Sequence, residues 1–172
     1  MEHAQPESPR VIAATLRAAR VDSRADLAAR ALAIARATAL GVLADAAAAE
    51  DVAQEVAIVA IQRGPRDPAK LDAWLHKVAV RKAIDEVRRR ARRRTVELEA
   101  HHDVHARTDD PQAVALALLA PLPPRQRAAL TLRYVHDLDD GAIARALGCR
   151  PGTVRSLLSR GREALREHLE DR

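Results

Sequence analysis

Aromatic side chains are almost missing from this 172-residue chain, which has no phenylalanine and only Trp74 and Tyr134 as aromatic residues. β-Strands favour aromatic and β-branched residues, whereas the Ala, Leu and Arg that dominate here favour helices. The composition therefore predicts an all-α protein. Because hydrophobic residues make up 48% of the chain, the helices can also bury a core.

Cysteine is nearly absent too, since Cys149 is the only one. One chain can then build neither a disulfide framework nor a cysteine-based zinc site. The sequence also has no Gly-rich phosphate loop, no cluster of metal ligands and no persuasive nucleophile–base arrangement. We therefore expect a protein that is not an enzyme, with no catalytic residues, no cofactor, no metal and no small-molecule substrate.

Long apolar runs are missing as well, because charged residues interrupt each of them. A membrane-spanning helix needs about 20 consecutive apolar residues. The first residues also lack the basic-then-apolar pattern of a signal peptide. These features predict a cytoplasmic protein with no membrane partner.

Positive charge is in excess, with 29 Lys and Arg against 24 Asp and Glu, which gives a net charge of +5. A small basic protein suits a polyanionic partner, either nucleic acid or an acidic membrane. The simpler alternative is that the arginines only solvate the helices.

The first half of the sequence predicts four helices, over 10–20, 24–43, 48–63 and from 68 to an arginine cluster ending at 94. Asp22 and Ser23 are expected to cap the second helix. Gly64-Pro65 should end the third, and Asp67-Pro68 has the cap-then-proline order that begins a helix. The arginine cluster consists of Arg88, Arg89, Arg90, Arg92, Arg93 and Arg94.

Residues 95–112 have a different composition, with five acids, one arginine and little periodic apolar signal. We interpret them as a flexible linker between an N-terminal domain, 1–94, and a C-terminal domain, 113–172. The linker contains His101, His102 and His105, whose spacing would allow a metal site if it were helical. A solvated linker is the favoured interpretation.

The C-terminal part predicts helices over 113–120, 124–135, 139–147 and 151–168. The last two have the features of a helix-turn-helix. Asp139 can cap the first, and small Ala144 allows close approach of the second. Gly148 suits the left-handed turn, and Pro151 begins the second helix.

The second of these helices separates its side chains by face. At about 100° per residue, the apolar positions share one sector: Val154, Leu157, Leu158, Gly161 and Leu165. The opposite face carries Arg155, Ser156, Ser159, Arg160 and Glu163. Arg and Ser donors suit DNA phosphates and the base edges of the major groove. The alternative is an ordinary helical hairpin with a solvated basic face.

Four segments in order resemble the motifs of extracytoplasmic-function (ECF) sigma factors, a group of the sigma-70 family. They are AEDVAQEV at 49–56, AWLHKVA followed by AIDEVRRR at 73–79 and 83–90, LPPRQRAAL at 122–130 and GTVRS at 152–156. The resemblance extends from about residue 24 to the end. It implies a four-helix sigma domain two and a sigma domain four with a helix-turn-helix. Its implied partners are core RNA polymerase, promoter DNA and an anti-sigma factor.

The resemblance also implies roles for individual residues. Docking on core polymerase falls on Asp51, Gln54 and Glu55. Recognition of the −10 element and its backbone falls on Lys77, Arg81, Lys82, Arg88 and Arg89. Reading of the −35 element falls on Thr153, Arg155, Ser156, Ser159 and Arg160.

Four positions depart from the family pattern: Ala57 replaces an aromatic residue, Arg81 an asparagine, Asp140 a tyrosine and Leu157 an arginine. The first two bear on −10 recognition and strand opening. They keep open a degenerate sigma-like protein that binds polymerase or an anti-sigma partner without opening promoters. A stand-alone helix-turn-helix regulator is a further alternative, although it leaves the docking motif unexplained. Trp74 is expected to belong to the core.

Overall fold

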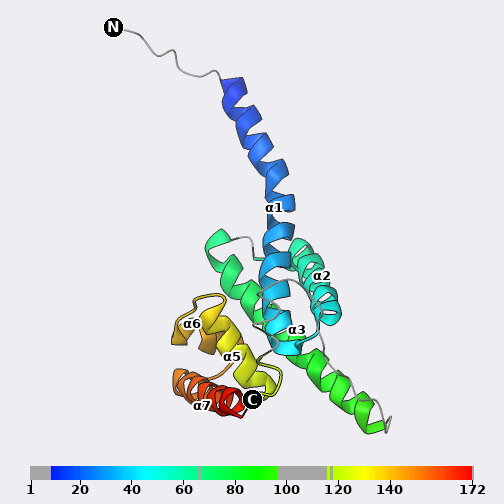
Figure 1. Cartoon of the computed structure of the whole chain (residues 1–172). Coiled ribbons are helices and arrows are strands. Elements are labelled where there is room, and N and C mark those ends of the chain that lie inside the picture. The colour runs from blue at the N-terminus through cyan, green and yellow to red at the C-terminus, as the bar shows by residue number, and fades with distance from the viewer. Residues whose placement is uncertain (1–8, 66, 97–115, 117, 172) are drawn as a thin grey trace.

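The structure is a computed structural model in which the backbone is described for residues 9–65, 67–96, 116 and 118–171, and side chains for 24–65, 67–93, 116 and 118–171. These residues form six helices, labelled in Figure 1. The predicted all-α class with two helical domains is confirmed. None of the helices in the described residues has an apolar stretch of the length that a membrane span requires.

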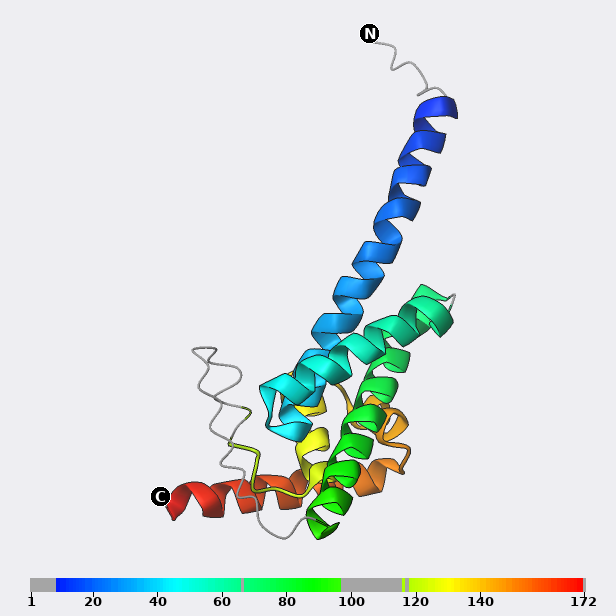
Figure 2. The same cartoon turned by 90° about the vertical axis from the view of Figure 1, so that its right-hand side faces the viewer.

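The first helix, α1 (Pro9–Leu43), is continuous, so the predicted break between 10–20 and 24–43 is wrong. Asp22 and Ser23 lie inside the helix instead of capping a second one. The physical reason is that each costs only about 0.5 kcal/mol relative to Ala in a helix interior. Flanking alanine, leucine and arginine residues offset that cost. The N-terminal half of α1 projects from the body of the molecule (Figures 1 and 2).

Helix α2 (Ala46–Arg63) begins two residues before the predicted 48–63 because Asp45 caps it. The Asp45 carboxylate accepts a hydrogen bond from the Ala48 backbone N–H at 3.1 Å. Helix α3 (Pro68–Val96) begins at the predicted proline, and Asp67 accepts from the Ala69 N–H at 3.0 Å. It extends two residues into the predicted linker. The rest of that linker, with its three histidines, lies outside the described residues.

The C-terminal helices are α5 (Pro124–Tyr134), α6 (Asp140–Leu147) and α7 (Pro151–Glu170). The predicted helix over 113–120 is wrong at its end, because 118–121 form a turn, whereas Leu116 is helical. Leu119 N–H donates to Leu116 and Leu122 N–H donates to Leu119, both over three residues. Proline has no N–H and disfavours helical backbone at the preceding residue, so Pro121 and the two prolines after it end regular helix here.

One hydrophobic core runs through both halves of the described chain. Its largest fully buried side chains include Val42, Val56, Leu75, Leu132 and Ile143. Trp74 packs against this core at partial exposure, as predicted. Helix α5 lies against α1 and α3, and α6 lies against α3, so the two domains are in direct contact (Figures 1 and 2).

Candidate nucleic-acid interface and docking surface

The predicted helix-turn-helix is present as α6 and α7, and its caps are the predicted ones. Asp139 accepts a hydrogen bond from the Ala142 N–H at 2.6 Å. Gly148 has a φ of 61° and ψ of 45°, the left-handed conformation that a β-carbon strains. The Cys149 N–H then closes the turn on the Ala144 carbonyl at 3.0 Å. The cap and the turn thus fix the angle at which α7 leaves α6.

Helix α7 is held against α5 by its apolar face. Val154 and Leu158 are buried, and Gly161 is buried at the crossing. A β-carbon at Gly161 would lie 3.0 Å from Leu130 Cδ1, so the small residue permits this close packing. Leu157 is half-buried against the core, on the side the sequence predicts. At this position, where the family has arginine, the chain therefore uses an apolar side chain that packs against the core.

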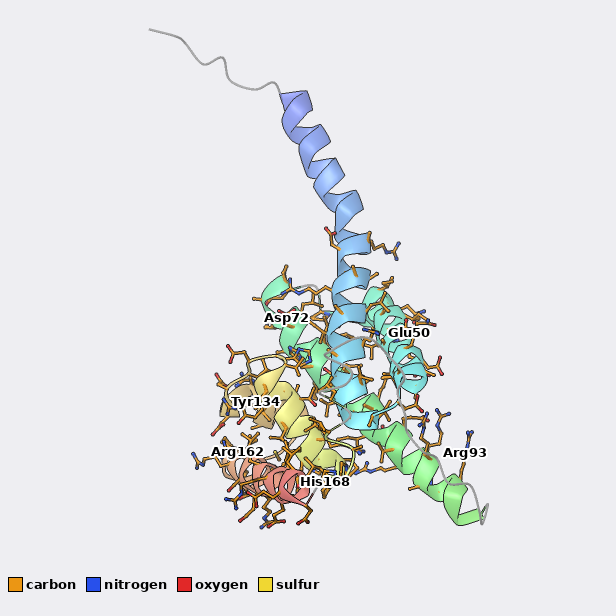
Figure 3. All side chains as sticks on the ribbon, in the orientation of Figure 1. Glu50, Asp72, Arg93, Tyr134, Arg162 and His168 are labelled. Carbon is orange, nitrogen blue, oxygen red and sulfur yellow. The ribbon has the colours of Figure 1, made fainter. Side chains whose placement is uncertain are left out.

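The opposite face of α7 is exposed. It presents all five residues predicted for −35 reading: Thr153, Arg155, Ser156, Ser159 and Arg160. Among the described residues, the Arg155 and Arg160 guanidinium groups have no acidic partner. Their donors are therefore available to an incoming polyanion. Figure 3 shows Arg162 on this helix pointing outward.

Two arginines of α5 that sequence analysis did not single out contact the first helix of the helix-turn-helix. Arg125 donates to the Leu147 carbonyl at 3.3 Å, which ties the end of α6 to the start of α5. Arg133 pairs with Asp140 at the start of α6. Asp140, a departure from the family tyrosine, thus has a local structural partner in this chain. Neither pair is apparent from sequence, because each depends on how α5 crosses α6.

The predicted docking residues Asp51, Gln54 and Glu55 are all exposed on α2. Gln54 Nε2 donates to Glu50 Oε1 at 3.4 Å, and Glu55 Oε2 lies 2.6 Å from Lys82 Nζ. The structure therefore joins two residues that the sequence assigned to different partners, Glu55 to polymerase and Lys82 to DNA. Both border a groove between α2 and α3, which is also lined by Ala48, Asp51, Val52, Asp85, Glu86, Arg89, Arg90 and Arg92.

Ala57, on the same helix, is only 6% exposed. A larger side chain at this position would have to fit into the core between α2 and its neighbours. The departure from the family aromatic thus concerns packing more than direct contact with DNA. Arg81, the other departure relevant to the −10 element, is exposed and lies 4.0 Å from Asp85.

The basic residues predicted for the −10 region lie along α3 and differ in their surroundings. Lys77 is exposed, whereas Arg88 pairs with Asp85 at 3.4 Å and Arg89 pairs with Glu86. Arg93, near the end of the helix, projects outward (Figure 3). Sequence analysis overlooked these acidic partners, although their spacing of three or four residues is the usual one for ion pairs along a helix.

Arg90 is the most constrained member of the cluster. Its guanidinium reaches Glu86 at 2.9 Å and Asp45, the cap of α2, at 2.8 Å. Burial alone would raise the pKa of Glu86, but hydrogen bonds from Arg90 and Arg89 outweigh it and hold that pKa below its ordinary value. Arg90 therefore tethers α3 to the start of α2, and it serves the fold of this domain.

Metal chemistry finds no support in the described residues, where no three His, Cys, Asp or Glu side chains gather into a possible site. His101, His102 and His105 lie outside that part of the chain. Cys149 is a free, partly exposed thiol in the turn of the helix-turn-helix.

Comparison with known protein families gives a match in each half of the chain. A family model described as Sigma-70 region 2 matches residues 27–93, and one described as Sigma-70, region 4 matches residues 113–165.

Curated relatives agree. The ECF RNA polymerase sigma factor SigE of Mycolicibacterium smegmatis is 35% identical over 133 residues, covering 70% of this chain and 51% of SigE. The probable RNA polymerase sigma-C factor of Mycobacterium bovis is 34% identical, covering 72% and 71%. SigF of Caulobacter vibrioides is 36% identical, covering 70% of each. The chain thus spans about half the length of SigE.

The solved structure of the sigma factor RpoE of Bartonella quintana, in complex with the anti-sigma factor NepR, is similar to this chain. The TM-score is 0.67 at 27% sequence identity, and the match covers 87% of this chain and 97% of the other.

Proposed function

This chain belongs to the ECF RNA polymerase sigma factors, and from that premise we propose that it binds core RNA polymerase and directs promoter-specific initiation through −35 and −10 elements. The observation that carries this proposal is the exposed face of α7, where Arg155 and Arg160 have no acidic partner within the described part of the chain, on a helix-turn-helix whose first helix is capped by Asp139. Such a face suits insertion in the major groove, with arginine bidentate to guanine or bonded to phosphate.

In this proposal the domain of residues 1–94 binds polymerase and the −10 element, residues 95–112 form the linker, and residues 113–172 bind the −35 element. The docking residues are Asp51, Gln54 and Glu55, and the −10 residues are Lys77, Arg81, Lys82, Arg88 and Arg89. Catalysis belongs to the polymerase, so this chain is not itself an enzyme. Because polymerase and the chromosome are its partners, it works in the cytoplasm.

An anti-sigma factor is the third proposed partner. The RpoE relative is bound to one, and that likeness covers most of both chains. The exposed acidic and amide groups of α2 offer a surface that polymerase and an anti-sigma factor could compete for. Competition would make occupancy of this helix the point of control.

Run-off transcription tests the proposal directly. Purified core polymerase is incubated with genomic promoter fragments, with and without this protein. We expect transcripts that appear only on its addition and that share −35 and −10 elements. The Gln54→Ala/Glu55→Ala variant should lose these transcripts and core binding while keeping its helical content, whereas Gln62→Ala, an exposed change farther along α2, should keep both.

The degenerate sigma-like protein remains a second candidate because Arg81 stands where the family has asparagine. Stable binding to core polymerase without any promoter-dependent transcript would favour it. DNA binding with no polymerase binding would instead favour the stand-alone regulator and contradict the proposal. Restoring the family residue, Arg81→Asn, should increase transcription if this position limits promoter opening.

A further inference from the structure

The interface between the two domains contains a very close approach of helices. Gly41 of α1 is buried, and a β-carbon there would lie 2.1 Å from Thr131 Oγ1 of α5. Thr131 is itself fully buried, and its hydroxyl donates to the Arg127 carbonyl at 2.9 Å. Only glycine lets the two helices meet at this distance, so residue 41 is fitted to the packed arrangement of the domains.

Beside this contact, one side chain from each of three elements meets across the interface. His136, in the turn after α5, places Nε2 2.8 Å from Thr38 Oγ1 of α1. Its ring also stands edge-on to His76 of α3, with ring centroids 4.5 Å apart and an interplanar angle of 64°. Thr38 and His76 are buried. His136 is partly buried, so the cluster joins residues from both domains through a polar contact that is largely removed from water.

The charged groups around this cluster come from every packed element, but most are already paired. Arg30 of α1 pairs with Asp72 of α3, one turn before His76. On the other side, Arg133 pairs with Asp140, and Asp137 is exposed. His76 Nδ1 and Asp72 Oδ1 are buried without a hydrogen-bond partner among the described residues.

These surroundings favour neutral imidazoles. Burial, and next the neighbouring His76, lowers the pKa of His136 from 6.5 to about 4. Burial also lowers the pKa of His76, with the nearby Asp72 carboxylate opposing the shift. A proton on either ring would lie close to the other ring, whose centroid is 4.5 Å away. Among the described residues, no acid opposes the lowered pKa of His136. Separation of the domains would return both rings to water.

We propose that the free chain rests in a closed form, locked by the Thr38–His136–His76 cluster beside Gly41, and that acidification opens it by charging the histidines. The closed form holds the recognition helix α7 at a fixed position relative to α3. Opening would let the two domains reach separate DNA elements, a consequence that rests on the proposed function. The lock itself does not depend on promoter binding.

The direction of the pH effect follows from the lowered pKa of His136. A group neutral in the closed form and charged in the open form favours closure fully above its open-state value of 6.5. That contribution to closure is lost progressively as the pH falls from 6.5 to about 4. For His136 alone, the ratio of open to closed molecules should rise about 10-fold between pH 7.5 and 5.5.

Single-molecule fluorescence transfer on the full chain measures this ratio without polymerase or DNA. Dyes are attached at two exposed positions, Gln62→Cys on α2 and Glu163→Cys on α7, in a Cys149→Ser background. We expect one short-distance population at pH 7.5 and a growing long-distance population at pH 5.5. His136→Gln, which keeps a polar side chain but does not titrate, should weaken the pH response, and the His76→Gln/His136→Gln double variant should abolish it.

Gly41→Ala tests the lock without any titration. Alanine is a better helix residue than glycine, so α1 should keep its helicity while the clash with Thr131 opens the domains at pH 7.5. The matched control is Gly152→Ala, because a β-carbon there meets nothing within 4 Å.

Three outcomes would overturn the lock: a single distance that ignores pH, a closed Gly41→Ala variant, or a pH response that survives in the His76→Gln/His136→Gln double variant. Because transcription is not the readout, failure of the lock leaves the proposed sigma function intact, and the reverse also holds.

Discussion

The arginines of α3 and those of α7 are both basic surfaces, yet they have different neighbours. On α3, Arg88, Arg89 and Arg90 pair with acids of the same domain, and Arg90 is used to hold α2 in place. On α7, Arg155 and Arg160 have no such partner among the described residues. Net charge alone does not distinguish these two surfaces. This difference in pairing predicts that the arginines of α7 bind DNA, whereas part of the α3 cluster stabilises the fold.

The largest effect is expected when the scaffold beneath the unpaired surface is damaged. Ile143 is fully buried where α6 packs on its neighbours. Ile143→Ala should lower the free energy of unfolding by about 2–4 kcal/mol through lost burial and a residual cavity. Urea denaturation followed by circular dichroism measures it. Ile58→Ala, at a residue 53% exposed on α2, is the matched control and should change stability by less than about 0.5 kcal/mol.

Removing one unpaired arginine should affect binding and leave stability unchanged. Arg160→Ala should weaken binding to the −35 duplex by about 1–3 kcal/mol if the side chain contacts a base. Fluorescence anisotropy on matched and mismatched duplexes over a salt series measures it. An equal loss on all sequences, with the slope of log K against log salt reduced by about 0.9, would identify a phosphate contact instead. No change on any duplex would contradict the contrast between α7 and α3.

Removing a paired arginine should lower stability and leave DNA binding unchanged. Arg90→Ala breaks the bridges to Glu86 and Asp45, and we expect a loss of about 1 kcal/mol in stability, because the Arg90 side chain is 40% exposed and solvent weakens its pairs. Thermal denaturation measures this loss. Arg92→Ala, an exposed change two residues away, serves as the control. If Arg90→Ala instead weakened DNA binding without lowering stability, its tethering role would be wrong.

The sequence was sufficient for the parts of the molecule that depend on neighbours in the chain. The cap at Asp139, the turn at Gly148 and the two faces of α7 are set by residues within one or two turns, and all were predicted. The pair Arg90–Asp45 joins positions 45 residues apart, and Thr38–His136 joins positions 98 apart. Such contacts depend on how helices cross, which periodicity alone does not determine. The domain boundaries and the assigned site residues stay predictions.

The break within α1 was predicted wrongly for a related reason. Asp22 and Ser23 are good caps, but a cap residue marks a helix start only when the preceding backbone leaves the helix. The Ala- and Arg-rich segment before them has no residue that forces this, so α1 continues. The preference of Asp22 and Ser23 for cap positions was interpreted as a helix boundary, although placing them inside a helix costs little free energy. The Glu86–Arg90 pair, four residues apart, is the case where a local signal was present and overlooked.

The smallest expected effect concerns how acid acts on the paired surface. Since the folded-state pKa of Glu86 is lowered, its contribution to stability is fully present above its ordinary value of 4.5 and is lost as pH falls through the folded value. Glu86→Gln keeps a hydrogen-bond acceptor for Arg90 but removes that titration. The variant should therefore lose less stability than the parent between pH 5 and pH 3, by less than about 1 kcal/mol. Urea midpoints at the two pH values measure the difference, with Glu163→Gln on the exposed face of α7 as the matched charge removal. If both variants lost as much stability between the two pH values as the parent, Glu86 would make no pH-dependent contribution through its arginine pairs. The distinction between the structural arginines of α3 and the DNA-binding arginines of α7 would then rest on Arg90 alone.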